Sequence, residues 1–515
     1  MDKPKVLKLS FNTDYGACQE KAGCGPLGPD GPWQAPIFDV EGGGPQLPLY
    51  PSLDFGNVFI TADEGGLYDP SVSSTSRKTG LRFLDRQEEV FLGSVINQTS
   101  SPMTSYFDNL TFASEPSDDA TVNMTVFAAS DWKYKTANGS SYSPWVGYLG
   151  LGDPFIIVED KVPSTLLNQV KSQGKIVTEA VSMNLASAKF QQSGSFILGG
   201  YDKSRVLGSP GVWSGLPSNS IILRDVTLGV EEGGSPFKIE TTVTKAAPLS
   251  IWQGLGGNRL GTEITRNCEA IAKHLPLTWR DEIGYYTWNV DDPQYKRIVT
   301  SPAYLGFVFS TPEAKNVTIK VAFALLDLTL ESPIVSNPTQ YFPCHPTDSE
   351  YGIWALGRAF LQAAFLGLDY ENNQTYIGQG PGPRQEQVLV KEWPKNNNAL
   401  ETSLADSYAS TWRPHWSVLP EKGNGSSGSL SGGAIAGIVM GIVGLLAVLT
   451  GLAWWLVRKR RNVVHDKDNS EVRHEDKEVV AHGVIQAQEM SGNTMSGMEQ
   501  QHELPAKQAV FEISG

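Results

Sequence analysis

An uncharged apolar run from Ala434 to Val457 constrains this chain more than any other feature of its sequence. A helix of that length crosses a bilayer core of about 30 Å with some tilt. Trp454 and Trp455 stand at its end, directly before the basic residues 458–461. Because basic flanks stay cytosolic and tryptophans favour the interface, the run predicts a single-pass type I membrane protein. Its N-terminal part is then extracellular or lumenal and its C-terminus cytosolic. The alternative, a buried core helix, is disfavoured by the length of the run.

Seven Asn-x-Ser/Thr sequons support this orientation independently, because all of them precede the apolar run. They begin at Asn97, Asn109, Asn123, Asn138, Asn316, Asn373 and Asn424. The sequence after residue 461 contains none. We therefore predict a glycoprotein whose sugars lie on the non-cytosolic side.

The N-terminus conflicts with this orientation, since residues 1–11 lack the apolar core of a signal peptide. A large domain needs a targeting signal to cross a membrane. We therefore expect the true start of the protein to lie upstream of Met1. The alternative is a cytosolic domain, in which the sequons would have no meaning.

The net charge limits the classes of partner that this chain can bind, and the cysteines indicate its redox compartment. The formal net charge is −14, and no long basic face precedes the apolar run, which argues against nucleic acid as a partner. Four cysteines fit an oxidising compartment, and three pairings are open on paper. The close Cys18 and Cys24 most simply pair with each other, which leaves Cys268 with Cys344. No motif indicates a metal or another cofactor.

Short runs rich in β-branched and aromatic residues predict a mostly-β protein. Examples are residues 57–60, 195–198, 221–226 and 317–323, separated by Gly, Pro, Asn and Ser turns. Helical patterns are few and short, for example at residues 164–173 and 266–274.

Several spaced fragments between residues 33 and 383 carry a family resemblance. They are Gly-Gly-Gly-Pro-Gln at 42–46, Tyr-Asp-Pro-Ser-Val-Ser-Ser-Thr at 68–75, Gly-Tyr-Leu-Gly-Leu-Gly at 147–152, Ser-Gly-Ser-Phe-Ile-Leu-Gly-Gly-Tyr-Asp at 193–202 and Trp-Ala-Leu-Gly-Arg-Ala-Phe at 354–360. In order and spacing they resemble the pepsin-like aspartic proteases. The layout of folded part, polar segment, single span and short tail is similar to membrane-anchored fungal members of that family.

The resemblance implies a bilobal pepsin-like fold with a cleft between two β lobes. Each lobe supplies one catalytic carboxylate from an Asp-Thr/Ser-Gly loop, supported by an apolar-apolar-Gly segment. Leu149-Gly150 and Leu356-Gly357 retain these supports. Cys268 and Cys344 fall where the second lobe often carries a disulfide.

On this basis the chain divides into six parts. They are an irregular N-terminal segment (1–32), an N-terminal β lobe (33–210), a C-terminal β lobe (211–384), a flexible Ser/Gly-rich stalk (385–433), the transmembrane helix (434–457) and a disordered cytosolic tail (458–515).

Asp54 is the candidate for the first catalytic carboxylate, because it follows residues 42–46 at about the family distance. Phe55 replaces the Thr or Ser whose hydroxyl braces the two loops in the family, and Asn57 replaces the usual Ser. The alternative is an ordinary Asp-x-Gly turn. The flap tyrosine of the family would fall near Asn97, and Tyr106 lacks the expected surroundings.

The second catalytic aspartate is missing. No Asp-x-Gly occurs between Pro236 and Trp252, and Thr244 or Lys245 stands where it belongs. Two close carboxylates share one proton because they cannot both ionise, and peptide hydrolysis needs both. The resemblance therefore implies a degenerate dyad.

These observations favour a pseudoenzyme that binds or senses at the cell surface, with a peptide or wall-polymer ligand in the old cleft. The alternative is an active, atypical aspartic endopeptidase that combines Asp54 with another acid, such as Glu240 or Glu263. A third reading is a structural wall or adhesion protein.

Gly433, Gly437 and Gly441 form two successive Gly-x-x-x-Gly steps at the apolar run. Such steps let two helices approach closely, which predicts a homodimer through the span. The alternative is chance spacing, because glycine is common in spans.

Overall fold

The structure of the protein is a computed structural model. It describes residues 5–13, 27–41, 45–52, 58–62, 66–81, 97–99, 103–112, 114–115, 120–130, 133–135, 139, 141–142, 146–151, 165–215, 221–238, 247–248, 265–344, 356–384, 387–395, 399–403 and 407–421. All of these fall in one compact unit. Within them, no helix is long and apolar enough to cross a membrane, and the apolar run 434–457 lies outside the described residues.

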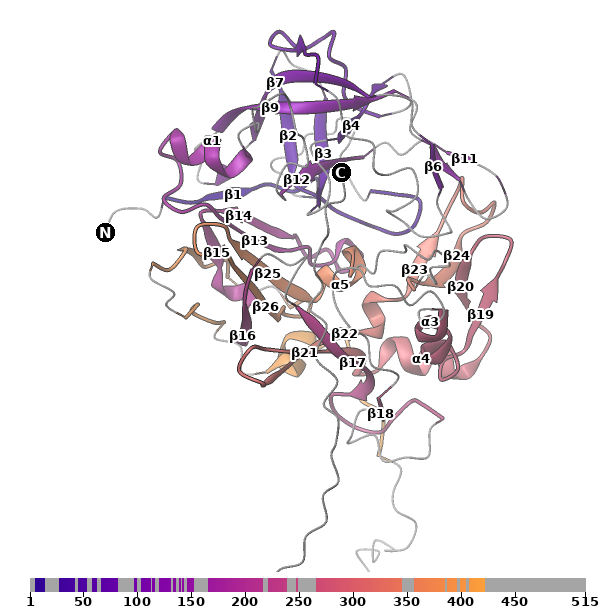
Figure 1. The fold of residues 1–515 in the computed structure, drawn as a ribbon. Helices are drawn as coiled ribbons and strands as arrows, with labels where there is room; N and C mark the ends of the chain where they lie inside the picture. The colour runs from indigo at the N-terminus through magenta and orange to yellow at the C-terminus, as the bar shows by residue number, and fades with distance from the viewer. Residues whose placement is uncertain are drawn as a thin grey trace, which may run out of the picture. The chain divides into compact units, whose positions relative to one another are not determined.

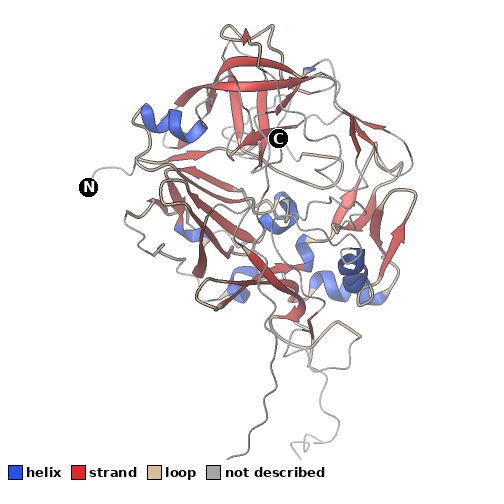
Figure 2. Cartoon of the chain, viewed as in Figure 1, coloured by secondary structure: helices blue, strands red, loops and turns tan. Residues whose placement is uncertain are grey.

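Strands dominate the described residues, which confirms the predicted mostly-β class (Figure 2). Strand β14 (Ser195–Leu198) has its predicted bounds, and β4 (Val58–Ile60) and β22 (Asn316–Ala322) lie within one residue of theirs. The two predicted helical patterns form α1 (Leu166–Ser172) and α3 (Thr265–Ala272).

Strands from distant parts of the chain form one antiparallel, seven-stranded central sheet (Figure 1). Its order is β16 (Leu207–Ser214), β26 (Gln374–Gln379), β25 (Ala364–Asp369), β13 (Ala180–Asn184), β14, β1 (Leu7–Leu9) and β8 (Ser114–Glu115). In the middle of the sheet, Val181 pairs with Leu198 on one side and Leu368 on the other. All three side chains are fully buried. The sheet thus joins the two predicted lobes through backbone hydrogen bonds.

Strand β1 corrects the prediction that residues 1–32 are irregular. Leu7, Leu9 and Phe11 are buried, and Lys8 pairs with Ile197 on β14 as well as with β8. The alternation of apolar residues is a strand pattern. It is short and stands beside Gly- and Pro-rich sequence, so pairing on both sides, rather than local propensity, stabilises the strand.

A second seven-stranded sheet forms the N-terminal part of the unit. Its order is β2 (Ile37–Val40), β3 (Gln46–Ser52), β12 (Gly147–Gly150), β4, β9 (Ala120–Ala129), β7 (Thr104–Phe112) and β5 (Arg77–Lys78). A further pairing between β2 and β7 closes it, as in a barrel. Leu110, Phe112 and Val122 are fully buried, while the residues that alternate with them face outward.

Asp108 on β7 is fully buried and organises the turn that precedes it in sequence. Its carboxylate accepts hydrogen bonds from Tyr68 Oη at 2.8 Å, Ser73 Oγ at 2.6 Å and Thr75 Oγ1 at 2.7 Å. These donors offset the cost of burying the charge. Burial, together with the Asp108 carboxylate, raises the pKa of Tyr68. The Tyr-to-Thr fragment of the family resemblance therefore supplies the donors to one buried acid.

Two four-stranded sheets and their helices make up the C-terminal part. The first sheet contains β18 (Ala247–Pro248), β17 (Ile222–Val230), β21 (Ala303–Ser310) and β22; the second contains β19 (Leu277–Arg280), β20 (Tyr285–Trp288), β24 (Thr339–Phe342) and β23 (Leu328–Leu330). Beside them lie α3, α4 (Pro293–Thr300), α5 (Arg358–Leu361) and the 3-10 turn η5 (Phe323–Leu325). The remaining short elements are β6 (Asn97–Thr99), β10 (Lys133–Lys135), β11 (Ser141–Tyr142), η3 (Ala188–Phe190) and η4 (Lys203–Arg205).

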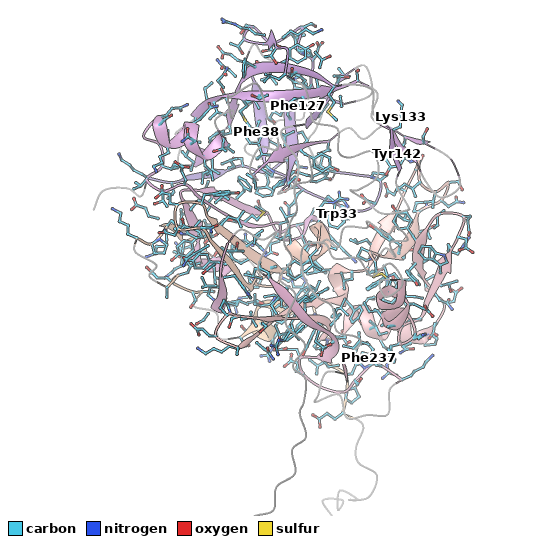
Figure 3. The ribbon with its side chains drawn as sticks, in the orientation of Figure 1. Trp33, Phe38, Phe127, Lys133, Tyr142 and Phe237 are labelled. Carbon is cyan, nitrogen blue, oxygen red and sulfur yellow. A yellow bond between two sulfur atoms is a disulfide. The ribbon has the colours of Figure 1, made fainter. Side chains whose placement is uncertain are left out.

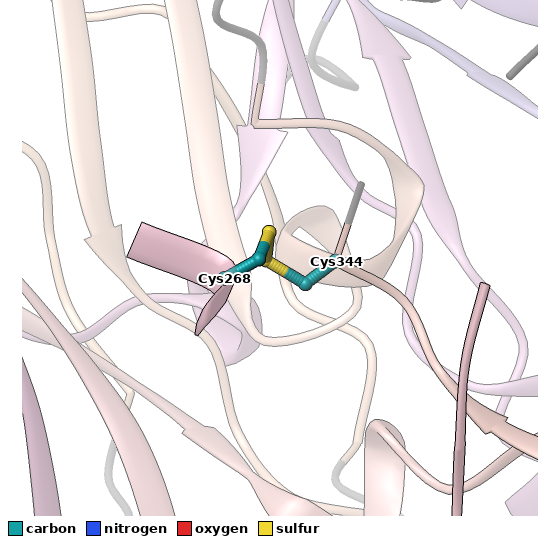
Figure 4. Close-up of a disulfide and its surroundings, with 2 residues drawn as sticks. All are labelled: Cys268 and Cys344. Atoms are coloured by element: carbon teal, nitrogen blue, oxygen red, sulfur yellow. A yellow bond between two sulfur atoms is a disulfide. The ribbon is translucent and has the colours of Figure 1, made fainter. Parts of the chain in front are cut away.

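The predicted disulfide bond is present between Cys268 on α3 and Cys344 after β24 (Figure 4). Their Cα atoms are 5.7 Å apart, and the bond spans 76 residues of sequence. A loop of that size corresponds to about 4 kcal/mol in the chain-entropy account. Cys18 and Cys24 lie outside the described residues.

The chain after residue 384 corrects the predicted start of the stalk at residue 385. Strand β27 (Val390–Glu392) pairs with β15 (Gly200–Asp202), and helix α6 (Tyr408–Trp412) begins at a capping box on Ser407. We call the described residues between 387 and 421 the C-terminal strap. Its polar composition predicts a flexible segment. Three tryptophans instead fix the segment to the folded unit, because they bury a large apolar area.

Those tryptophans fill space left by glycines and small residues. Trp393 is 2 % exposed and donates from Nε1 to Asp369 at 2.8 Å. Trp412 is 1 % exposed and stacks on Trp416, with ring centroids 5.0 Å apart. A Cβ atom at Gly382 would lie 2.6 Å from the Trp412 ring, so only glycine fits there. The strap is therefore part of the core.

We predict that Trp412→Ala lowers the free energy of unfolding by about 3–5 kcal/mol, because it leaves a cavity in this cluster. The matched control is Val418→Ala, at a strap residue that is 53 % exposed, for which a change within about 0.5 kcal/mol is expected. Chemical denaturation of both variants measures the difference. If both substitutions change the free energy of unfolding equally and only slightly, the segment behaves as the predicted flexible stalk.

Candidate functional site

The connection that contains Asp54 is anchored on both edges of one strand. Strand β3 runs parallel to β12, and its last residue, Ser52, pairs with Gly150. Strand β4 begins at Val58, which pairs with Tyr148 on the other edge of β12. Asp54 itself lies outside the described residues. The connection thus joins the two neighbours of the strand that carries the first supporting segment.

Both supporting segments are described. Leu149 is fully buried, and the N–H of Leu151 donates to the carbonyl of Ser52 at 2.8 Å. Leu356 is half-buried, and Gly357 is the N-cap residue of α5. The first segment therefore packs against the strand that leads toward Asp54, and the second leads directly into Arg358.

The predicted replacements for the second acid, Thr244 and Lys245, lie outside the described residues. The alternative acids Glu240 and Glu263 do so as well. The geometry of a dyad therefore stays a prediction. Tyr106, which sequence reasoning considered for the flap, lies within β7 and packs edge-on against Tyr68 at 6.4 Å.

The predicted glycosylation sites fall into three groups. Asn316 at the start of β22 and Asn373 in the turn after β25 are exposed. Asn109 and Asn123 pair across β7 and β9, and Asn97 begins β6. Asn138 and Asn424 lie outside the described residues.

A charged and aromatic cluster links the two parts of the unit beside the second supporting segment. Arg358 Nη2 lies 2.8 Å from Asp30 Oδ2, although 328 residues separate them in sequence. The guanidinium carbon lies over the ring of Trp33, 4.5 Å from its centroid, and over that of Tyr50, 4.7 Å from its centroid. We call these four residues the arginine clasp. Trp33 lies between the N-terminal and C-terminal parts of the unit (Figure 3).

Further hydrogen bonds fix the acid of the clasp. Trp33 Nε1 donates to Asp30 Oδ1 at 2.9 Å, and Tyr341 Oη donates to the Asp30 carbonyl at 2.5 Å. The Glu331 N–H also donates to the carbonyl of Pro29 at 2.7 Å. Both oxygens of the Asp30 carboxylate are therefore used by N–H donors. This arrangement holds an ion pair and does not resemble two acids that share a proton.

The electrostatics around the clasp follow from burial. Burial by itself lowers the pKa of Arg358, but the Asp30 carboxylate opposes this effect and the net pKa is raised. Burial raises the pKa of Tyr50 and Tyr142, and it raises that of Tyr341 strongly. The clasp therefore presents a fixed cation among neutral tyrosines at any ordinary pH.

Sequence reasoning quoted Arg358 only as part of a family fragment and missed the clasp. The signal available was a charged residue directly after the apolar-apolar-Gly support. In the described residues, no group of three or more His, Cys, Asp or Glu side chains could hold a metal ion.

We predict that Arg358→Met destabilises the protein by about 2–4 kcal/mol, because it leaves Asp30 partly buried without its cation. The matched control is Arg280→Met, since Arg280 and its partner Glu282 are half-exposed. That change should cost less than about 1 kcal/mol.

The double variant Asp30→Asn with Arg358→Met should lose less stability than Arg358→Met alone, because no uncompensated charge is left. Chemical denaturation of wild type, Asp30→Asn, Arg358→Met and the double variant completes this double-mutant cycle. Additive losses from the two clasp substitutions would contradict a coupled pair.

Comparisons with known proteins bear on the first part of the unit. The sequence profile of the eukaryotic aspartyl protease family matches residues 59–215. No curated protein matches the chain. Among solved structures, the chain is similar to the aspartic proteinase from Irpex lacteus, with 13 % sequence identity and a TM-score of 0.45. That likeness covers 73 % of this chain and 97 % of the other.

The matched segment contains most of β4, strands β5, β7, β9 and β12 of the N-terminal sheet, and strands β8, β13, β14 and β16 of the central sheet. It also contains the Asp108 turn and the first supporting segment, two of the fragments on which the resemblance rests. Residues 59–215 therefore carry the likeness of this chain to the eukaryotic aspartyl protease family.

Proposed function

We propose that this protein is a membrane-anchored, aspartic-protease-like protein that binds or senses at the cell surface and does not hydrolyse peptides. The observation that carries the proposal is the sequence between Pro236 and Trp252, which contains no Asp-x-Gly. Hydrolysis in this family needs two close carboxylates that share one proton. Thr244 or Lys245 would stand in place of the second.

Either replacement removes the proton-sharing pair. An ammonium group at Lys245 would favour the ionised form of Asp54, which then has no proton to share. A hydroxyl at Thr244 would leave Asp54 as a lone acid that can at most orient water. Asp30 is no substitute, because Arg358 and Trp33 already occupy its carboxylate oxygens.

The membrane part of the proposal is supported by the apolar run 434–457 and its basic flank 458–461. The sequons at Asn316 and Asn373 are exposed, as glycosylation in a lumenal or extracellular compartment requires. A peptide or wall polymer in the cleft of the family is the ligand class that the resemblance implies.

An active, atypical endopeptidase is the second candidate, and the family match of residues 59–215 favours it. It would use Asp54 with a second acid that remains to be identified. Loss of one positioned acid typically costs about 10²–10⁴-fold in rate, so residual cleavage is the feature that separates the candidates.

We predict that the wild-type protein retains peptides from a mixed library at pH 3–6 without cleaving them. Asp54→Asn should leave this result unchanged, and Asp291→Asn, at an exposed residue, is the matched control. Mass spectrometry of the library before and after incubation makes the measurement. Cleavage by wild type and by Asp291→Asn, but not by Asp54→Asn, would establish the endopeptidase instead.

We also predict that the protein stays in the membrane pellet after alkaline carbonate extraction. Replacing both Leu445 and Leu449 by Arg places two charges inside the span, and each costs several kcal/mol at that depth. The double variant should move to the soluble fraction. The conservative double change to Ile is the control, and loss of that control from the pellet would count against a span.

A further inference from the structure

Two sequons face each other on the outer surface of the closed N-terminal sheet. Asn109 on β7 is directly opposite Asn123 on β9. Both backbone polar groups of Asn123 bond to the Gln169 side chain, and the carbonyl of Asn109 accepts from the Glu41 N–H. The pair is thus of the non-hydrogen-bonded type, in which Cα atoms are about 4.5 Å apart and side chains are closest.

The two side-chain amides are already in contact. Asn123 Nδ2 donates to Asn109 Oδ1 at 2.8 Å, and Asn109 Nδ2 donates to Glu41 Oε2 at 2.8 Å. An N-linked sugar is attached to Nδ2. Two such sugars would begin on neighbouring atoms and point the same way from the sheet, and each sugar ring is wider than the gap between them.

Among the described residues, neither Asn316 nor Asn373 is paired with another sequon. Asn316 pairs with Ser310 across β22 and β21. Asn373 lies in a turn, at φ +50°. Both positions are exposed, so they serve as internal controls.

We propose that Asn109 and Asn123 act as a single glycosylation site, so that a folded chain carries a sugar on one of them and never on both. The inference rests on the lumenal location proposed above. Asn123 is the preferred position, because it is exposed, whereas Asn109 is half-buried with its amide held by Glu41.

The chemistry is compatible with the contact between the amides. Nδ2 attacks the anomeric carbon of a lipid-linked oligosaccharide diphosphate. The C–N bond forms, the C–O bond to the lipid diphosphate breaks, and one amide proton is lost. Nδ2 of Asn123 keeps its other hydrogen, which still donates to Asn109 Oδ1. A second transfer, to Asn109, would force the two sugars into the same space or open the strand pair.

The test uses the full chain, expressed in eukaryotic cells behind an added signal peptide because residues 1–11 lack one, and purified from their surface. Trypsin releases residues 87–133 as one peptide that holds both asparagines, and Asn97→Gln removes the third sequon within it. Enzymatic removal of the sugars in ¹⁸O-water marks each formerly modified asparagine. Mass spectrometry then counts the marks on one peptide.

We expect one mark on this peptide, mostly at Asn123. Asn123→Gln should raise the mark at Asn109 severalfold, while the marks at Asn316 and Asn373 stay unchanged. A peptide with both marks, or an Asn109 that stays unmarked in Asn123→Gln, would overturn this inference alone. No mark at any sequon, Asn316 and Asn373 included, would overturn the lumenal location and this inference with it.

Discussion

Backbone hydrogen bonding across the central sheet is the constraint on which the rest of the structure depends. The sheet takes β1 from the start of the chain, β13 and β14 from its middle, and β25 and β26 from near residue 370. A strand in the interior of a sheet satisfies its polar backbone only through both neighbours. Val181 pairs with Leu198 of the same predicted lobe and with Leu368 of the other. Neither predicted lobe alone therefore supplies both neighbours of this strand.

The sequence pattern alone predicted those elements whose stabilising residues lie within a few positions of one another. Strand β14 is buried along its whole length, and its bounds were predicted from its run of aromatic and aliphatic residues. The Cys268–Cys344 bond followed from counting and from the resemblance. Strand β1 and the C-terminal strap were missed because their stabilisation is non-local. Trp412 packs against Gly382 and Phe190, which are distant from it in sequence. The polar residues around it in the sequence predicted a stalk.

The same distinction applies to the candidate site. Sequence placed the supports Leu149-Gly150 and Leu356-Gly357, and the structure pairs the first of them with Ser52, two residues before Asp54. It could not reveal the arginine clasp, because no local rule connects Asp30 with Arg358. Such a pair becomes visible only when the fold brings an acid, a cation and two aromatic rings together. A partly buried cation over aromatic rings is stabilised by their faces, whereas the same cation without these rings would be more costly to bury. The clasp therefore fixes the end of β3, through Tyr50, against the segment that supports the second loop.

The strap changes what the proposed membrane anchor can do. Its last described contacts hold Ser417 to Thr300 and Leu419 to Gly234, both in the C-terminal part. Only residues 422–433 separate the described unit from the apolar run. A fully extended chain reaches about 3.5 Å per residue, so twelve residues span at most about 40 Å. A flexible stalk from residue 385 would allow several times that freedom. If the run spans a membrane, the folded unit is held within that short reach, and any load on the anchor passes first through the contacts of Ser417 and Leu419. Those contacts are backbone hydrogen bonds backed by the packing of Trp412 and Trp416, so the core of the strap, rather than a solvated linker, is the element that resists the load.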